Sequence, residues 1–359
     1  MAKLWRPPAA RRRGGGLWGF ISMLMSLAIV GGAVALVGAF IFIAEANRAG
    51  PSPEASTFMV ERGQSAAHIA ANLEAQHQIR NALFFRIATR AYARGEGLQA
   101  GEYAIPAGAS LREIVRMMAE GDALQHAITF PEGITIAAAM RLIEASDLLT
   151  GDLPETPPEG SILPETYHVQ RGMTRAALLQ KMRQARDTAL AEIWEGRQPN
   201  LPLATPEQMV ILASIVERET GVPQERPMVA SAFVNRLRRP MRLESDPTII
   251  YGVCHQFPAR CRDGRLVDAT GSPRLIRQSE IDLNTGYNTY RIDGLPPTPI
   301  ANPGRLALEA VAHPAESNAI FFVANGAGGH VFAATVAEHN ANVARWRQIE
   351  AQRLAEERH

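Results

Sequence analysis

Twenty-eight consecutive residues near the N-terminus, residues 17–44, carry no charged side chain. A membrane-spanning helix needs about 20 apolar residues to cross a hydrocarbon core of about 30 Å, and this stretch is longer. The apolar segment of a cleaved signal peptide is shorter, about 7–15 residues. The sequence therefore predicts a retained single-pass transmembrane helix, with a cleaved signal peptide as the alternative.

Basic side chains precede this apolar stretch, and no acidic residue occurs before Glu45. The basic residues are Lys3, Arg6, Arg11, Arg12 and Arg13. The positive-inside rule then predicts that residues 1–16 form a cytoplasmic tail and that the chain after Glu45 lies across the membrane. Over the whole chain 37 basic and 36 acidic residues nearly cancel, so the net charge favours no particular partner. No basic stripe follows the N-terminal tail beyond a short patch at 236–242, so we expect no nucleic-acid partner.

The chain after the apolar stretch divides into a linker and two domains. Residues 45–56 contain Pro and Ser and predict a short linker. Residues 57–126 predict a small module of strands and helices, and residues 127–359 a larger domain that mixes both. In the larger domain we expect helices at 136–145, 174–194, 206–220, 227–237 and 336–358, and strands at 319–324 and 330–334. The expected fold class is therefore α+β behind a transmembrane helix.

The small module has clear local signals. A strand at 57–60 leads through a turn at Gly63 to a helix for which Ser65 is a suitable N-cap. Ser110 and Glu113 have the spacing of a capping box for the next helix. The strand–turn–helix opening resembles that of a LysM glycan-binding repeat, and a packing module without a ligand is the alternative.

One helical stripe in the larger domain ends in an acid. Leu212, Ile215, Val216 and Glu219 follow i, i+3, i+4, i+7 spacing, so Glu219 continues a buried apolar face. Desolvation there should raise the pKa of the carboxyl, as a general acid near neutral pH requires. Glu217 lies off this stripe and is expected to be the less buried acid. The alternative for Glu219 is a helix-end acid paired with an arginine.

The two cysteines, Cys254 and Cys261, lie in the predicted exported part. A local disulfide and two free thiols both remain open. His255 would add only a third ligand, so no zinc site is expected. The Gly-rich stretch 325–329 lacks phosphate-loop spacing, so no nucleotide cofactor is expected either.

Three polar stretches rich in Gly, Pro, Asn and Tyr, at 163–167, 242–252 and 287–304, predict loops that line a cleft, and loops that only connect elements are the alternative. The side chains expected to contact a bound sugar chain are Asp246, Asn235, Tyr251, Tyr290 and Glu165. Asp246 belongs to a Ser-Asp-Pro turn, so hydrogen bonds to the local backbone are its alternative role.

Several ordered motifs together resemble one enzyme family. They are ASIVERET at 213–220, VASAFVNRL at 229–237, SDPTIIYG at 245–252, YNTY at 287–290, GLPP at 294–297 and IANPG at 300–304. The pattern resembles the endolytic murein transglycosylase family, also called YceG-like, over nearly the whole chain.

The resemblance implies a bacterial inner-membrane enzyme with a periplasmic catalytic domain and no cofactor. It would cleave the β-1,4 bond between MurNAc and GlcNAc inside nascent peptidoglycan strands without water, leaving 1,6-anhydroMurNAc ends and terminating strand elongation. The family's catalytic acid is a glutamate of the Glu-x-Glu helix end, which aligns with Glu219, and Glu217 is the alternative. The implied partners are peptidoglycan strands, the membrane and peptidoglycan synthases. The alternative function is a membrane-anchored peptidoglycan-binding scaffold that cleaves nothing.

Overall fold

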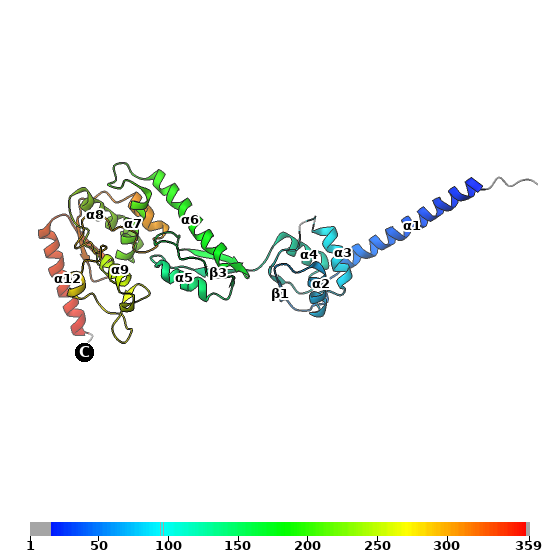
Figure 1. Cartoon of the computed structure of the whole chain (residues 1–359), viewed down its shortest axis with the longest axis horizontal. Helices are drawn as coiled ribbons and strands as arrows, with labels where there is room; N and C mark the ends of the chain where they lie inside the picture. The colour runs from blue at the N-terminus through cyan, green and yellow to red at the C-terminus, as the bar shows by residue number, and fades with distance from the viewer. Residues whose placement is uncertain (1–15, 94, 96, 357–359) are drawn as a thin grey trace, which may run out of the picture. The chain divides into compact units, whose positions relative to one another are not determined.

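The computed structural model describes residues 16–93, 95 and 97–356 and contains two compact units. The first unit ends at Leu124 and the second begins at Gln125 (Figure 1). The predicted basic tail lies outside the described residues except for Gly16, as do residues 357–358 of the predicted C-terminal helix. We describe each unit by itself.

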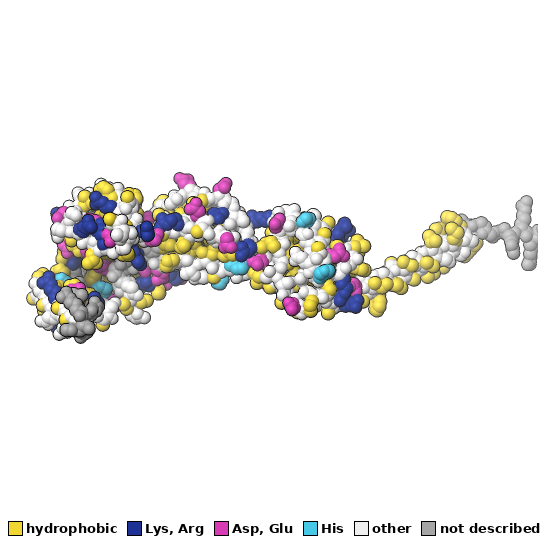
Figure 2. Space-filling model, turned by 90° about the horizontal axis from the view of Figure 1, so that it is seen from below, with side chains coloured by type: hydrophobic (Ala, Val, Ile, Leu, Met, Phe, Trp, Pro, Cys, Tyr) yellow, Lys and Arg dark blue, Asp and Glu magenta, His cyan; other side chains and the backbone are white. Residues whose placement is uncertain are grey.

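Helix α1 (Gly16–Asn47) is long and apolar enough to cross a membrane. Its hydrophobic side chains, such as Leu36 and Phe40, are exposed along its length, and Figure 2 shows hydrophobic side chains along the helix with no charged side chain among them. A helix that exposes so much apolar surface needs an apolar environment around it. The predicted N-terminal apolar helix is therefore present.

The rest of the first unit packs strands and helices around an apolar core. β1 (Ser56–Val60) pairs antiparallel with β2 (Gly101–Ile105), and α2 (Ala66–Ala75), α3 (Ala82–Tyr92) and α4 (Leu111–Glu120) complete the unit. The core contains Phe58, Val60, Ile69, Leu73, Phe85, Tyr103, Ile114 and Met118. The predicted caps are confirmed, because Ser65 accepts a hydrogen bond from the His68 N–H and Ser110 forms a capping box with Glu113.

The second unit begins with β3 (Gln125–Thr129), which pairs antiparallel with β5 (Thr166–Gln170). Short pairs join β4 (Leu149–Thr150) to β6 (Met173–Thr174), β7 (Cys261–Arg262) to β8 (Arg265–Leu266), and β9 (Phe321–Ala324) to β10 (His330–Ala333). The loop predicted at 163–167 is wrong at its end, because Thr166 and Tyr167 begin β5. The Tyr167 ring packs edge-on against Phe130 in the core, a contact that the local composition does not reveal.

The helices predicted in the larger domain are present within two residues at each end. They are α5 (Ile136–Ala145), α6 (Arg175–Gly196), α7 (Pro206–Glu219), α8 (Arg226–Arg238) and α12 (Val336–Glu356). The shorter elements are α10 (Gln278–Ile281) and the 3-10 turns Pro223–Glu225 and Pro258–Arg260.

Two further helices were not predicted. α9 (Asp246–Gln256) begins inside the loop predicted at 242–252, and α11 (Arg305–Ala312) lies where no element was predicted. The loop predicted at 242–252 is wrong from Asp246 onward. Pro247 lies in the first turn of α9, a position that proline favours because its missing N–H has no partner there. Ile249 and Val253 bury the inner face of α9. The Ser-Asp-Pro sequence is therefore a helix start.

Helix α7 is enclosed by the second unit. Helices α6, α8, α9 and α11 all contact it, and the nine residues from Met209 to Glu217 are all buried. A helix that is buried all round has no single buried stripe. The predicted stripe of Leu212, Ile215 and Val216 is real but is only part of the buried surface, and Glu217 is buried with it.

Candidate functional site

Glu219 is the last residue of α7, and its carboxylate meets the start of α9. The hydroxyl of Ser245, the N-cap residue of α9, donates a 2.8 Å hydrogen bond to Glu219 Oε2. Ser245 is fully buried, and its own N–H donates to the Thr289 hydroxyl at 2.9 Å. The Ser245 side chain accepts no capping hydrogen bond from the backbone of α9, and its hydroxyl bonds to Glu219 instead.

Asp246 follows Ser245 and lies close to the same carboxyl. The hydroxyl of Tyr290 donates a 2.8 Å hydrogen bond to Asp246 Oδ1, which joins α9 to the loop after Thr289. Asp246 therefore has a partner 44 positions away in sequence in addition to its place at the helix start. The structure thus brings together three residues that the sequence predicts for the site: Glu219, Asp246 and Tyr290.

Burial dominates the electrostatics of Glu219. The pKa of its carboxyl is raised to about 7, chiefly by desolvation, and the negative charge of Asp246 contributes in the same direction. The hydrogen bond from Ser245 and the positive charge of Arg236 lower it. A carboxyl with a pKa near 7 is partly protonated at neutral pH, so it can donate a proton and then hold the negative charge.

Glu217 is more enclosed than Glu219, so the predicted order of burial is wrong. Its side chain is 4% exposed, whereas Glu219 is half-buried. Arg226 donates a 2.6 Å hydrogen bond to Glu217 Oε1, and the Gly304 N–H donates to Oε2 at 2.9 Å. Burial raises the pKa of Glu217, and the Gly304 N–H and the Arg226 charge oppose that shift. The prediction failed because it assumed one buried face on a helix that is buried all round.

The partners of Glu217 form a structural network. Arg226 Nη2 also donates to Glu132 Oε2 at 2.8 Å, so one guanidinium joins two carboxylates. A Cβ at Gly304 would contact the Glu132 carboxylate, so any larger residue there would require Glu132 to move from its pairing with Arg226. Both carboxylate oxygens of Glu217 therefore accept hydrogen bonds that hold α7, α8 and the start of α11 together. Among the described residues, the Glu219 carboxylate accepts a hydrogen bond from the Ser245 hydroxyl.

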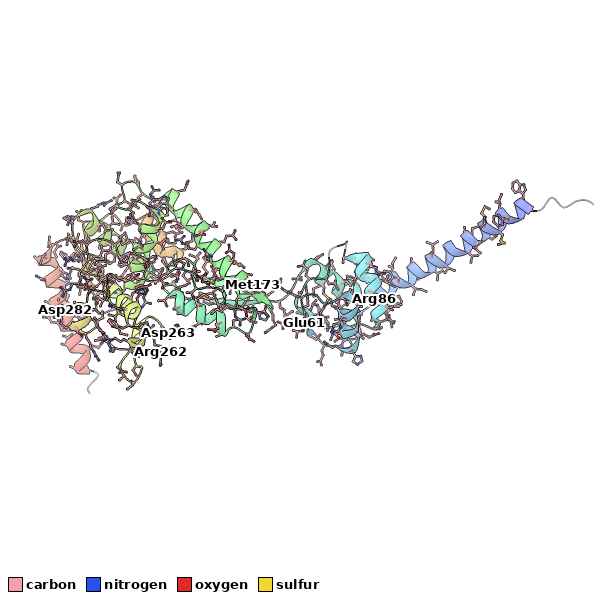
Figure 3. The ribbon with its side chains drawn as sticks, viewed as in Figure 1. Glu61, Arg86, Met173, Arg262, Asp263 and Asp282 are labelled. Atoms are coloured by element: carbon pink, nitrogen blue, oxygen red, sulfur yellow. A yellow bond between two sulfur atoms is a disulfide. The ribbon has the colours of Figure 1, made fainter. Side chains whose placement is uncertain are left out.

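A cavity of about 340 Å³ lies between α5 and α9. Arg218 and Pro247 line it, and they adjoin Glu219 and Asp246 in sequence, although Glu219 itself is not among the lining residues. Arg141 and Asp263 form a 2.6 Å ion pair at its edge (Figure 3 labels Asp263). The other lining residues include Thr135, Ile136, Ile250, His255 and Ile300. The cavity therefore opens next to the end of α7.

A second acid with a raised pKa, Glu159, lines this cavity. Its Oε1 accepts 2.8 Å hydrogen bonds from the Ile136 N–H and from the amide of Asn302. Desolvation raises the pKa of Glu159 to about 7, and these hydrogen bonds oppose the shift. Glu159 thus caps the N-terminus of α5 and also presents a titratable group to the cavity.

Aromatic rings and the two cysteines form the α9 side of the cavity. The Tyr251 ring lies 6.0 Å from the stacked His255 ring and 4.9 Å from Tyr287. Cys254 and Cys261 are joined by a disulfide with Cα atoms 5.4 Å apart, so the open question about the thiols is answered in favour of the disulfide. This bond ties the end of α9 to β7.

Two predicted substrate-binding residues have other surroundings. The side-chain amide of Asn235 donates to the carbonyls of Ser317 and Ala319 at 2.8 and 3.0 Å, which fixes the approach to β9. Glu165 is exposed just before β5. Among the described residues, no contact joins it to Glu219 or to the cavity.

Hydrogen bonds to Glu225 connect the β9–β10 hairpin to the segment just after α7. His330 Nδ1 lies 2.8 Å from Glu225 Oε2, and the His330 N–H donates to Glu225 Oε1 at 2.8 Å. Thr220, the residue after Glu219, donates its hydroxyl to Glu225 Oε2 at 3.3 Å. The hairpin therefore supports the segment that carries Glu219.

The family model for the YceG-like family matches residues 58–345, which is well over half of the chain. The chain belongs to the YceG-like family. Among YceG-like relatives, an endolytic murein transglycosylase of Bacillus subtilis (strain 168) is 27% identical over 312 residues, covering 78% of this chain and 82% of the relative. An endolytic murein transglycosylase of Streptococcus pneumoniae serotype 2 (strain D39 / NCTC 7466) is 31% identical over 190 residues, covering 52% of this chain and 32% of that protein.

A solved structure is also similar. It is the 2.6 Å crystal structure of a yceG-like protein from Listeria monocytogenes, with 25% sequence identity and a TM-score of 0.47. The match covers 81% of this chain and 99% of that chain.

The sequence reasoning did not find Ser245, Glu159 or Arg226. Ser245 had only a partial signal, because the Ser-Asp-Pro sequence marks a helix start but does not show that the serine hydroxyl turns away from its own helix. Glu159 had no local signal, since Ile136 and Asn302 are 23 and 143 positions away. Arg226 was hidden because the carboxylates that hold it, Glu132 and Glu217, come from separate segments.

Proposed function

We propose that this protein is an endolytic lytic transglycosylase that cleaves peptidoglycan strands between MurNAc and GlcNAc. Membership of the YceG-like family and relatives named endolytic murein transglycosylase support this activity. The observation that carries the mechanism is Glu219, a half-buried carboxyl with a pKa near 7 and one hydroxyl partner at the end of α7. Such a group is suited to donate a proton at neutral pH.

In the proposed reaction, protonated Glu219 donates its proton to the glycosidic oxygen as the bond from MurNAc C1 to GlcNAc O4 breaks. The C6 hydroxyl of the same MurNAc attacks C1, and its proton passes to the Glu219 carboxylate. A C1–O6 bond replaces the C1–O4 bond, Glu219 regains its proton, and no water is consumed. One carboxyl therefore suffices, whereas a hydrolase normally uses two.

The cavity between α5 and α9 would hold a sugar unit next to the cleaved bond. Tyr251 supplies an aromatic face and Arg218 a charged donor at its wall, a mixture typical of carbohydrate sites. Asp246 and Tyr290 would orient the substrate from the α9 side, and Asp246 also keeps the pKa of Glu219 high. We assign no substrate contact to Asn235 or Glu165. The Asn235 amide is bonded to the carbonyls before β9, and Glu165 is exposed and does not line the cavity.

We propose further that α1 spans the bacterial inner membrane with residues 1–16 in the cytoplasm and the rest in the periplasm. The disulfide Cys254–Cys261 supports an oxidising compartment for the second unit. Residues 57–126 would form a LysM-like module that contacts glycan, and residues 127–359 the catalytic domain. Peptidoglycan synthases that make nascent strands are the proposed partners, because cleavage inside those strands ends their growth.

To test this function, the full chain in detergent is incubated with purified glycan strands, and mass spectrometry identifies the sugar at the new end of each product. We expect 1,6-anhydroMurNAc ends, and none with Glu219→Gln. Reducing ends would show a hydrolase instead. Strand binding by the wild-type protein without any product would support the scaffold alternative and reject the enzyme.

A further inference from the structure

One face of α3 combines exposed apolar and basic side chains. Leu83 and Ile87 are 60% and 40% exposed, and Arg86 and Arg90 are exposed beside them. These four residues follow i, i+3, i+4, i+7 spacing and so share one face of the helix. Within the described part of the chain, neither arginine forms an ion pair. The opposite face, with Phe85 and Ala88, is buried in the first unit.

The membrane-spanning candidate α1 is fixed directly to α3. The ring of Phe42, near the end of α1, stacks 6.3 Å from Phe84 and 6.1 Å from Tyr92. Ala46, one turn later, is fully buried in the same core. Helix α1 therefore enters the folded unit without a flexible joint, and α3 lies within about one turn of its last apolar residues.

The length of α1 determines the depth in the membrane at which Phe42 packs against α3. The uncharged stretch 17–44 has 28 residues, which at about 1.5 Å per residue spans about 42 Å. A hydrocarbon core of about 30 Å leaves roughly eight of these residues in the headgroup layers. Phe42 is third from the end of the stretch, so the residues that it contacts on α3 lie at headgroup depth.

We propose that this face of α3 lies in the headgroup layer of the membrane that α1 spans. Leu83 and Ile87 insert among the lipids, and Arg86 and Arg90 bind the phosphates of anionic phospholipids. Interfacial helices have this pairing of apolar and basic side chains. In Figure 3 Arg86 lies at the end of the unit from which α1 extends and Glu61 at the other end, and Figure 2 shows Lys and Arg side chains where α1 meets the unit.

The proposal rests on the membrane-spanning role of α1, and a depth measurement on the full chain tests both. The two cysteines of the sequence are paired in a disulfide, so one introduced cysteine gives one labelling site. The variants are Leu83→Cys on the α3 face and Glu61→Cys as the exposed matched control. Each carries an environment-sensitive fluorophore and is reconstituted in nanodiscs of zwitterionic lipid with or without anionic phosphatidylglycerol.

The probe at position 83 should emit at shorter wavelength than the probe at 61, be quenched by brominated lipid and be protected from iodide. Equal iodide quenching at both positions would overturn the α3 proposal. Iodide protection at 83 without quenching by brominated lipid would also overturn it, since protein and not lipid would then cover the site. A chain that fails to co-elute with nanodiscs would overturn the role of α1 and the α3 proposal together.

A second pair of variants tests whether the arginines of α3 bind lipid phosphates. Arg86→Glu should reduce lipid quenching at position 83, most strongly in the phosphatidylglycerol nanodiscs. Arg62→Glu, which makes the same charge change next to Glu61, should leave the quenching unchanged. Equal effects of the two variants would reject phosphate binding by this face.

Discussion

The hydroxyl of Ser245 donates a 2.8 Å hydrogen bond to Glu219, and this bond favours the ionised form of the carboxyl. Activity that needs protonated Glu219 falls as the pH rises through its pKa, near 7. Ser245→Ala removes a stabiliser of the anion, so the pKa should rise and the alkaline limb of kcat/KM should move to higher pH, by roughly one unit. A pH–rate profile of strand cleavage measures the shift.

Asp246→Asn should move the same limb in the opposite direction. The negative charge of Asp246 raises the pKa of Glu219, so removing that charge should lower the pKa and bring the decline to lower pH. The substituted side chain retains an amide oxygen that can accept the Tyr290 hydroxyl. Shifts of the same sign in both variants would contradict the assignment of Glu219 as the titrating acid.

The two glutamates at the end of α7 should fail in different ways. Glu219→Gln should lower kcat by about 10²–10⁴-fold, the usual contribution of a general acid, and leave the fold intact. Glu217→Gln breaks a buried pair with Arg226 and should lower the free energy of unfolding by about 3 kcal/mol. Denaturant unfolding and single-turnover cleavage measure the two effects. A stable but inactive Glu217→Gln protein would make Glu217 the acid.

Glu159→Gln should change how stability depends on pH. The folded protein raises the pKa of Glu159 to about 7, above its ordinary value. The folded state therefore holds this proton more tightly than the unfolded chain, so the contribution of Glu159 to stability is greatest at low pH and is lost as the pH rises through about 7. Without this carboxyl, Tm should fall less between pH 5 and 8. The matched control, Glu165→Gln at an exposed site, should follow the wild type, and identical curves for all three proteins would refute the assignment.

Reduction of Cys254–Cys261 should loosen the wall of the cavity. A disulfide that closes so short a loop contributes about 2 kcal/mol in the chain-entropy description. The Cys254→Ser/Cys261→Ser variant should therefore have a lower Tm and faster hydrogen exchange in residues 254–266 than in α7. Exchange that increases equally in both segments would show that the bond supports the whole unit.

Local signals predicted much of the fold, because they act within a few residues. Ser65 and the Ser110–Glu113 box fixed two helix starts, and the uncharged stretch 17–44 identified α1. α9 was missed because Ser-Asp-Pro begins turns as well as helices, and only the burial of Ile249 and Val253 distinguishes the two.

The site depends on contacts between distant segments, and there the sequence was less informative. It predicted Glu219, Asp246 and Tyr290, which the structure brings together. It gave the wrong order of burial for Glu217 and Glu219. The spacing of apolar residues identifies one buried helix face, but it does not show that other helices pack against α7 on every side.

The hydrogen bonds between Glu225 and His330 limit how far the protein can be shortened from its C-terminal side. These residues are 105 positions apart, yet they hold the segment just after Glu219. A chain that stops before β10 would retain every residue of the proposed proton transfer but would lose the brace behind them. We therefore expect an active fragment to extend through Ala333, because a shorter chain lacks the hairpin contact to the segment just after Glu219.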